Sequence, residues 1–364
     1  MMPESTRARH AGEPVARTES RFDVVDSDAI RFFPELVRER GGEPERLLRR
    51  AQIDLGVVSK RGSVFQYRAM VNLFDIAATE LQCPDFGLQL AALQGGTRVM
   101  GPIGVVMKNS KTLGHALGYC AKQIQAYSLA TRVRFVPDRA HHKLFVGLEI
   151  LLDRLANESQ AIEHALLLAN LNVIDITGGA ARVRQVCFRH APVSALNVYA
   201  GAFGCEVLFG AAADGIVFEE QDLLCPVIAP DEWLYEMATS FIANHYSPGT
   251  PPLHARVRAL INRLLGSEGC TNERVAAELC MHPRTLQRRL KCEGKSFEGI
   301  KDEVRREVAV RYLQCPDVPL AQVAGKLGYA AQSVLSRSCY RWFAASPREL
   351  RERSMAGVPG DFKA

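Results

Sequence analysis

A proline-rich break two thirds of the way along this 364-residue chain constrains its fold more than any other feature. Ser247 to Pro252 reads SPGTPP, so three prolines and a glycine fall within six residues. Proline lacks a backbone N–H and its ring clashes with the preceding helical turn, so no regular helix can continue through this segment. The two sides must therefore fold as separate parts, and we expect a linker at residues 247–253.

Beyond this break, apolar residues recur at helical spacing in short pieces, and no strand pattern interrupts them. Helices are expected at about 254–265, 272–279, 283–292, 297–314, 320–326, 332–343 and 347–353. We therefore predict an all-α domain over 254–354, followed by a tail at 355–364.

Before the break, helical and strand patterns of apolar residues alternate along the chain. Helical spacing covers 67–92, with a break at Pro84, and continues at 112–125, 157–175 and 194–203, while strand patterns fall at 129–136, 143–152, 183–188 and 215–219. Residues 21–246 are therefore expected to form an α+β domain. Residues 1–20 combine both charge signs with proline and glycine and lack an apolar core, which predicts a disordered tail and argues against a secretory signal.

The composition narrows the class of protein. With 47% apolar residues the chain can bury two cores. Its longest apolar runs, such as Leu148 to Leu152, fall far short of the roughly 18 residues that a membrane helix needs. The ten cysteines show no C-x-x-C spacing, so neither a zinc site nor a redox pair is indicated. Separate reduced thiols fit the cytosol, so a cytoplasmic location is expected.

Charge is distributed unevenly. Residues 251–355 hold 19 Lys or Arg against 11 Asp or Glu, a net charge of +8, whereas the rest of the chain holds 26 against 29, a net charge of −3. A basic excess at the C-terminal end suits a polyanionic partner, although a solvated basic face explains it equally well.

A pattern typical of a helix-turn-helix lies within the helical region: a support helix, a tight turn and a second helix with one apolar and one polar face. Val275, Ala276 and Leu279 are expected to face inward, 280–282 to form the turn, and Pro283 to begin the second helix. The polar side chains on its outer side are Arg284, Gln287, Arg288 and Lys291. These residue types hydrogen-bond base edges or phosphates.

The same pattern recurs further along the chain. Val323, Ala324 and Leu327 are expected to face inward, 328–330 to turn, and 332–343 to form a second outer helix. Its outward side chains are expected to be Gln332, Ser333 and Arg337. Two units joined by a long helix over 297–314 would place two recognition helices in successive major grooves, roughly 34 Å apart.

These residues resemble the AraC/XylS family of transcription regulators. The shared phrases are V-A-x-x-L from Val275, R-T-L-Q-R-R-L from Arg284, R-x-x-x-A-x-x-x-L from Arg305, V-A-x-x-L-G-Y from Val323, R-W-F from Arg341 and S-P-R-x-L-R from Ser346. The resemblance implies base contacts by Arg284, Gln287 and Arg288 in the first unit. In the second unit it implies contacts by Gln332, Ser333, Val334 and Arg337.

The second unit departs from the family pattern. Leu335 and Cys339 stand where the family usually carries aromatic residues, and the acidic residue usual near Ala331 is absent. Smaller core side chains bury less apolar area, so the second recognition helix is expected to be looser or less discriminating than the first. In the first unit His282 replaces the commoner Ser and is expected to be a helix cap or an exposed residue.

Residues 21–246 resemble, more weakly, the effector and dimerisation domain of the ornithine-regulator and VirS-like branch. Gly101-Pro-Ile-Gly-Val-Val106 and Lys111 to Leu117 carry part of this resemblance, with Phe188 to Pro192 and Leu223 to Pro226. It implies a small organic effector and a homodimer. The glycine-rich turns beside apolar helices could line a ligand pocket or pack tightly in a core.

No metal, cofactor or catalytic residue is predicted. The adjacent His141 and His142 would point to opposite faces of a strand and so could not chelate one ion with His115 and His164. G-x-S-x-G, S-x-x-K, H-E-x-x-H and phosphate-loop motifs are all absent.

The sequence thus predicts a cytoplasmic, non-enzymatic regulator that binds double-stranded DNA, with RNA polymerase as a further partner. Two rivals stay open: an enzyme with an appended DNA-binding module, and a scaffold that binds DNA without sequence preference.

Overall fold

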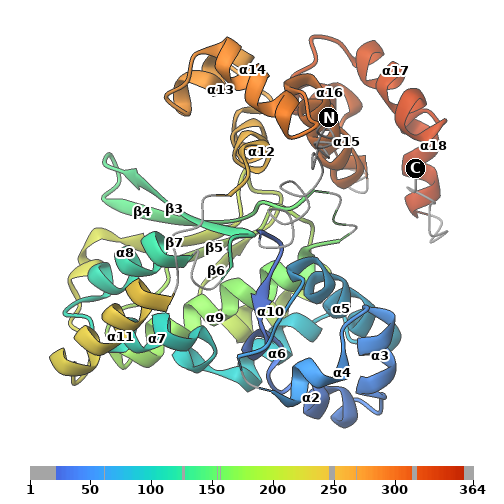
Figure 1. Ribbon diagram of the computed structural model, residues 1–364. Coiled ribbons are helices and arrows are strands. Elements are labelled where there is room, and N and C mark those ends of the chain that lie inside the picture. Colours follow the sequence, from blue (N-terminus) through green and yellow to red (C-terminus); the bar gives the residue numbers. More distant parts are fainter. Residues whose placement is uncertain are drawn as a thin grey trace, which may run out of the picture.

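The computed structural model describes residues 22–60, 62–124, 128–153, 155, 157–245, 251–267, 269–313 and 318–355 (Figure 1). A mixed region of helices and sheet comes first, and the helices coloured orange to red follow it at the top of Figure 1. The predicted tail at 1–20, residues 247–250 of the predicted linker and residues 356–364 of the predicted C-terminal tail lie outside the described residues.

The first part of the chain is mainly helical. Its elements are β1 (Val25–Asp26), η1 (Ser27–Ile30), α2 (Phe33–Glu39), α3 (Pro44–Arg50), α4 (Leu55–Ser59), β2 (Val64–Phe65), α5 (Tyr67–Glu80) and α6 (Phe86–Gln94). Strands β1 and β2 pair antiparallel. Ile30, Phe33, Leu73, Phe74 and Phe86 are fully buried and form the centre of one core. The predicted break at Pro84 is confirmed, because α5 ends before it and α6 begins after it.

A five-stranded sheet follows, with the order β3-β4-β7-β5-β6. Its strands are β3 (Thr131–Asp138), β4 (Lys143–Ile150), β5 (Gln185–Cys187), β6 (Glu206–Leu208) and β7 (Gly215–Glu219). Only β5 and β6 run parallel; the other pairs are antiparallel. The four predicted strands are confirmed, whereas β6 was not predicted.

Helices pack against this sheet and enclose a second core. They are η2 (Gly96–Met100), α7 (Gly101–Lys108), α8 (Leu113–Gln123), α9 (Ser159–Thr177), α10 (Leu196–Phe203), η4 (Glu220–Leu224) and α11 (Glu232–His245). Val146, Ile162, Leu166, Ile216 and Phe218 join sheet and helices in one apolar cluster. The N-terminal part is therefore mixed α and β, as predicted.

One local prediction was wrong. Gly101 to Val106 is not a turn but the start of α7, and a Cβ built on Gly104 would lie 2.2 Å from the Thr97 carbonyl oxygen, so this glycine serves close packing. At the start of α9 the Asn157 side chain accepts a hydrogen bond from the Ser159 N–H at 3.1 Å, and Glu158, directly before the helix, makes no such bond.

The C-terminal part is helical, and its described residues contain no strand. The helices are α12 (Leu253–Leu264), α13 (Asn272–Glu278), α14 (Pro283–Cys292), α15 (Phe297–Leu313), α16 (Leu320–Lys326), α17 (Gln332–Phe343) and α18 (Pro347–Met355). All seven predicted helices are present. They surround a third core, to which Val257, Ile261, Leu286, Val304 and Leu335 belong.

Helix α12 belongs to two cores at once. Val257 and Ile261 lie in the C-terminal core, while Ala255 and Ala259 pack into the helical core of the N-terminal part. Alternate faces of one amphipathic helix therefore join the two parts of the molecule. Within the described residues, no helix combines the length and apolar character that crossing a membrane requires.

Candidate nucleic-acid interface

Two helix pairs, α13–α14 and α16–α17, share one turn geometry. In the first pair the Met281 N–H donates to the Ala276 carbonyl over 2.8 Å, and in the second the Tyr329 N–H donates to the Ala324 carbonyl over 2.9 Å. The residue before each donor has a positive φ, +53° in Cys280 and +69° in Gly328. The same hydrogen bond and the same left-handed residue therefore end both support helices.

Helix α14 has an apolar inner face and a polar outer face. Leu286 and Leu290 are fully buried in the C-terminal core, and His282 caps the helix because its Nδ1 accepts from the Arg284 N–H at 3.3 Å. The predicted contact residues Arg284, Gln287, Arg288 and Lys291 are all exposed. Their spacing of three, four and seven residues puts the four side chains on one side of the helix.

Helix α17 presents a narrower polar face. Leu335 and Cys339 are fully buried, and Ser333 and Arg337, four residues apart, are exposed on the opposite side. The predicted contact residues Gln332 and Val334 lie on either side of that face; Gln332 is exposed, but Val334 is half-buried.

Sequence reasoning missed Tyr340. This side chain is 56% exposed and follows Ser333 by seven residues, so it lies on the same face of α17 as Ser333 and Arg337. An exposed tyrosine offers both an aromatic ring and a hydroxyl group that can donate or accept a hydrogen bond. The helical spacing from Ser333 was the signal that could have identified it.

Helix α15 holds the second pair in place. The Arg305 guanidinium donates to the Leu327 and Gly328 carbonyls at 2.9 and 3.2 Å and lies 4.4 Å from the centre of the Tyr329 ring. Asp302 accepts from the Trp342 indole N–H at 2.9 Å and pairs with Arg341. The turn of the second pair and the end of α17 are thus both attached to α15.

The first pair is linked to α15 as well. The Lys301 ammonium donates to the Cys270 carbonyl at 2.6 Å, just before α13. Arg258 of α12 is buried and forms ion pairs with Glu303 and Glu307 of α15. Helix α15 is therefore the element on which both outer helices depend for their positions. At the top of Figure 1, α13 and α14 lie to its left and α17 lies to its right.

Ion pairs connect this helical region to the N-terminal part. Lys295, just before α15, lies 3.3 Å from Asp153, and Arg311, in the last turn of α15, lies 3.1 Å from Glu158. Burial alone would raise the pKa of Asp153, but Lys295, Arg258 and Arg68 together hold that pKa below its usual value. Both carboxylates belong to the segment between β4 and α9, so one segment contacts α15 near each of its ends.

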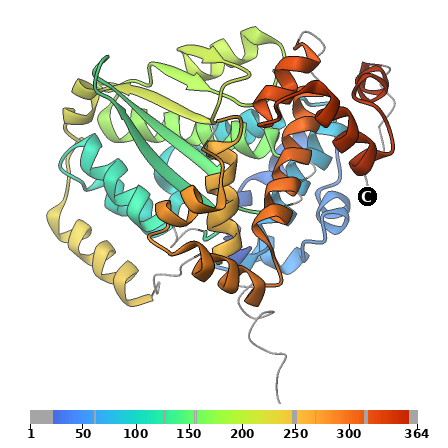
Figure 2. The ribbon, with the colours of Figure 1, turned by 90° about the horizontal axis from the view of Figure 1, so that it is seen from above.

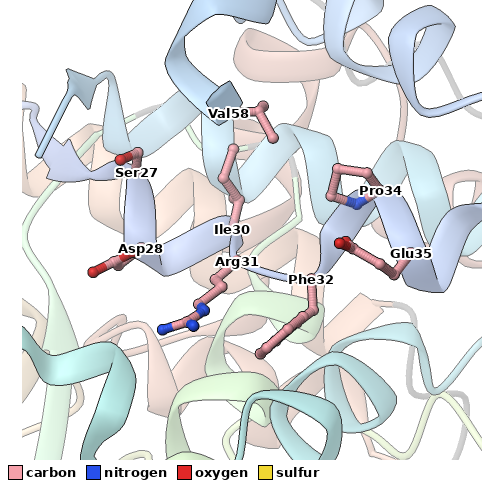
Figure 3. A pocket seen from close by; sticks show the side chains of 8 residues that line it. All are labelled: Ser27, Asp28, Ile30, Arg31, Phe32, Pro34, Glu35 and Val58. Atoms are coloured by element: carbon pink, nitrogen blue, oxygen red, sulfur yellow. The ribbon is translucent and has the colours of Figure 1, made fainter. Parts of the chain in front are cut away.

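The cavities in the described residues of the N-terminal part include one near the start of the chain and one beside α11. One, of about 290 Å³, lies between η1, α2 and α4 and is lined by polar side chains such as Asp28, Arg31 and Glu35 together with Ile30 and Phe32 (Figure 3). The other, of about 340 Å³, is lined by Lys108, Asn109, Asp175, Ile176, Ile228, Ala229 and Leu234.

His141, His142 and His164 each contact a different group. His164 is buried, with its Nε2 atom 2.8 Å from the Gln94 side-chain oxygen. His141 and His142 are exposed and contact different carboxylates, Asp138 and Glu220. Among the residues that the structure describes, no three His, Cys, Asp or Glu side chains form a group that could hold a metal ion.

Two known families match separate parts of the chain. The family described as the arabinose-binding domain of AraC transcription regulator, N-terminal, matches residues 41–227, and a helix-turn-helix domain family matches residues 275–353. The second match includes α14, α15, α16 and α17.

Individual relatives are transcription regulators. The HTH-type transcriptional regulator VirS of Mycobacterium tuberculosis is 34% identical over 328 residues, which cover 90% of this chain and 96% of that protein. The ornithine utilization regulator of Pseudomonas aeruginosa is 32% identical over 80 residues, or 22% of this chain and 24% of that protein. A crystal structure of the transcriptional regulator CdpR from Pseudomonas aeruginosa covers 85% of this chain and 96% of its own, with 18% identity and a TM-score of 0.40.

The arabinose-binding match spans about half of the chain, and the similarity to VirS extends through both parts. This chain therefore belongs to the AraC family of helix-turn-helix transcription regulators.

Proposed function

We propose that this protein is a ligand-modulated regulator that reads a bipartite site in double-stranded DNA with two helix-turn-helix units joined by α15. The observation that carries the proposal is the repeated turn, which ends α13 and α16 with the same hydrogen bond and is followed each time by a helix with a polar outer face. Helix-turn-helix proteins place such an outer helix in the major groove.

In this proposal α14 makes most of the contacts that recognise the DNA sequence. Arg284, Gln287, Arg288 and Lys291 form one exposed face, and their amide, guanidinium and ammonium groups suit base edges and phosphates. The net charge of +8 over residues 251–355 supplies the attraction to the phosphate backbone.

The second helix, α17, contributes fewer contacts. Gln332, Ser333, Val334 and Arg337 are its proposed contact residues, and Tyr340 is added on the strength of its exposure. Ala331 at its N-cap makes no side-chain hydrogen bond. A helix whose first turn lacks a cap frays more readily, so this unit is expected to discriminate less between sequences than the first.

The N-terminal part is proposed to bind a small organic effector. The arabinose-binding match to residues 41–227 supports this, and most of the lining of the 340 Å³ cavity falls within that match. The ion pairs Lys295–Asp153 and Arg311–Glu158 offer a route by which a change in this part alters the placement of α15. We further propose that the protein acts in the cytoplasm as a homodimer and contacts RNA polymerase.

Effector binding is tested by thermal unfolding of the full chain against a panel of small metabolites. A compound that binds only the folded state must raise the unfolding midpoint, and above its dissociation constant the rise must continue with the logarithm of its concentration. If no compound raises the midpoint, the effector proposal loses its support.

Sequence reading is tested with duplexes selected by the full chain from a random-sequence pool. We expect a specificity ratio of at least roughly 10³ over random duplex. Arg288→Ala should cost about 1–3 kcal/mol of binding free energy and relax the preference at one base position. Arg289, exposed on the same helix but off the proposed contact face, is the matched control, and Arg289→Ala should leave base preference unchanged.

Two results would contradict sequence reading by α14. If the Arg288→Ala protein binds the selected duplex as tightly and as selectively as the parent, α14 does not read bases as proposed. If the parent itself shows no preference over random duplex, the protein binds DNA as a scaffold.

A further inference from the structure

The cavity of about 290 Å³ between η1, α2 and α4, which we call the η1 cavity, is lined by charges of both signs. Arg31 contributes a guanidinium, and Asp28 and Glu35 contribute carboxylates. Among the residues that the structure describes, none forms a hydrogen bond or an ion pair with these three charged groups. Asp28 and Arg31 are half-buried, and charges that lose part of their hydration are usually paired. The three groups are therefore suited to charges that a ligand supplies.

The backbone that carries Arg31 is fixed from behind. Buried Gln94 of α6 donates through its side-chain amide to the Ala29 and Arg31 carbonyls, at 3.0 and 2.9 Å. At the start of η1 the Asp26 carboxylate accepts from the Asp28 N–H at 2.8 Å. A site whose supporting groups are already in place loses little conformational entropy when a ligand binds.

Phe32 turns the chain sharply between η1 and α2. Its φ of +65° and ψ of 5° lie in the left-handed region, where a bulky side chain is strained. The turn allows residues before and after it to line one cavity, and Figure 3 shows Arg31 on one side of Phe32 and Glu35 on the other. Strain of this kind is concentrated at functional sites, because the surrounding structure must hold it in place.

The cavity beside α11 differs in this respect. Lys108 pairs with Asp175 at 3.2 Å, and Asp175 also accepts from the Thr97 hydroxyl at 3.0 Å. The Asn109 side-chain oxygen accepts from the Asp231 N–H at 2.9 Å. A polar ligand in that cavity would have to compete with these bonds. Of these two cavities, the η1 cavity is therefore the better site for a charged ligand.

We propose that the η1 cavity binds a small molecule that carries both a carboxylate and an ammonium group, as a free amino acid does. The proposal rests on the proposed function, for which it names the site and the chemical class of the effector. The ligand's carboxylate pairs with Arg31, whose planar guanidinium suits a carboxylate, and its ammonium group pairs with Glu35. Asp28 gives the lining an excess of negative charge, which favours the cationic end. Pro34 and Val58 supply apolar surface for the rest of a small ligand.

The segment that carries the η1 cavity also contacts the C-terminal part. The Phe22 ring meets the His254 ring of α12 edge to face, with their centres 6.4 Å apart. Asp23 pairs with Arg68, which lies 4.0 Å from Asp153, in the segment that contacts α15. Figures 1 and 2 show the dark blue start of the described chain beside α12. A ligand that binds η1 therefore acts a few residues away from contacts that reach α12 and α15.

Calorimetric titration of the full chain with each of the twenty common L-amino acids tests the ligand class. We expect at least one of them to bind. Two analogues of that amino acid, one without the carboxylate and one without the ammonium group, should bind roughly tenfold more weakly or worse, because each loses a charge-assisted hydrogen bond. If no amino acid binds, or if either analogue binds as tightly as the amino acid, the proposal is overturned.

Single substitutions test the site. Arg31→Gln and Glu35→Gln should each raise the Kd of the bound amino acid roughly tenfold. In the Arg31→Gln protein the amino acid should also lose its advantage over the analogue without a carboxylate. Glu39, exposed on the same helix as Glu35 but outside the cavity lining, is the matched control, and Glu39→Gln should leave the Kd unchanged. Glu35 is exposed, so the Glu35→Gln protein tests the site even if Arg31→Gln impairs folding.

Failure of this site is distinct from failure of the proposed function. If an amino acid binds the parent, Arg31→Gln and Glu35→Gln equally well, the η1 cavity is not its site, but the N-terminal part still binds an effector. If the amino acid binds in the η1 cavity and leaves the affinity for a selected duplex unchanged, the site stands and the ligand modulation of the proposed function fails.

Discussion

Glu163 on α9 places a carboxyl group inside the core of the N-terminal part. Its side chain is fully buried, and it accepts a hydrogen bond from the Tyr199 hydroxyl at 2.7 Å. The same hydroxyl accepts from the N–H groups of Val193 and Ser194. Burial raises the pKa of Glu163 to about 8, although the hydrogen bond from Tyr199 opposes that rise.

This raised pKa predicts a pH dependence of stability. A glutamate in the unfolded chain titrates near 4.3. Between that value and about 8 the folded state holds the proton more tightly, so the contribution of Glu163 to the free energy of unfolding is fully present below the unfolded pKa and is lost as the pH rises. Glu163→Gln keeps an acceptor for Tyr199 and cannot ionise. Relative to the parent, its free energy of unfolding should therefore increase from pH 5 to pH 8.

Urea unfolding of the parent and of Glu163→Gln at intervals between pH 5 and pH 8 checks this. Parallel pH profiles for the two proteins would contradict the raised pKa of Glu163 in the folded state.

At the scale of elements, α14 and α17 differ in how they begin. The His282 side chain caps α14, while α17 starts after Ala331, which has the extended backbone of an N-cap but no side-chain acceptor. Ala331→Ser should supply the missing hydrogen bond to the first turn of α17 and stabilise the protein by about 1 kcal/mol. Ala330→Ser adds the same hydroxyl one residue earlier, outside the cap position, and should have little effect.

Thermal unfolding compares these two variants with the parent. The cap should also steady the first turn of α17, so duplexes selected by Ala331→Ser should show a sharper preference in the half-site assigned to this helix. Equal unfolding midpoints for all three proteins would contradict the expectation that a side-chain cap at position 331 stabilises α17.

At the scale of the whole molecule, the placement of α15 depends on groups from the N-terminal part. The double substitution Asp153→Asn with Glu158→Gln keeps the size of both side chains and removes their charges. Because Lys295 and Arg311 then lose their ion-pair partners in that segment, we expect a loss of about 1–3 kcal/mol in the free energy of unfolding. Affinity for a selected duplex should also change.

The control for this prediction is the pair Arg38–Glu45, which is exposed on both sides and far along the chain from α15. Glu45→Gln should leave both the free energy of unfolding and the affinity for DNA unchanged, because solvent screens an exposed pair. If the double variant behaves like Glu45→Gln, the segment between β4 and α9 does not control α15.

The residues that face the solvent in α14 illustrate what sequence alone could predict. Leu286 and Leu290 define the inner side of a short helix, so Arg284 and Arg288 must lie on the outer side whatever surrounds the helix. For the same reason the predicted helices of the C-terminal part match the structure closely. Each of them is determined by contacts between residues near one another in the chain.

Other features depended on residues far apart in the chain. Strand β6 has three residues, too few to show a period, and it is a strand because Val207 pairs with Val186 of β5. The glycines of α7 have the composition of a turn, but Gly104 packs against the Thr97 carbonyl of η2, a contact that the local sequence does not reveal. The exposure of the apolar side chains of α11 could not be predicted from sequence either. An apolar helical face reads the same whether it packs on a core or lies in water.

Local periodicity thus determined the helical C-terminal part, its two outer helices and most of the strands, since backbone hydrogen bonding and side-chain alternation act over a few residues. Only the tertiary structure decided that α12 serves two cores, that the segment between β4 and α9 contacts α15, and that Trp233 and Met237 remain in water. Those outcomes depend on which distant surfaces meet, and burial of apolar area, which drives that choice, depends on the whole folded chain and on no short stretch of it.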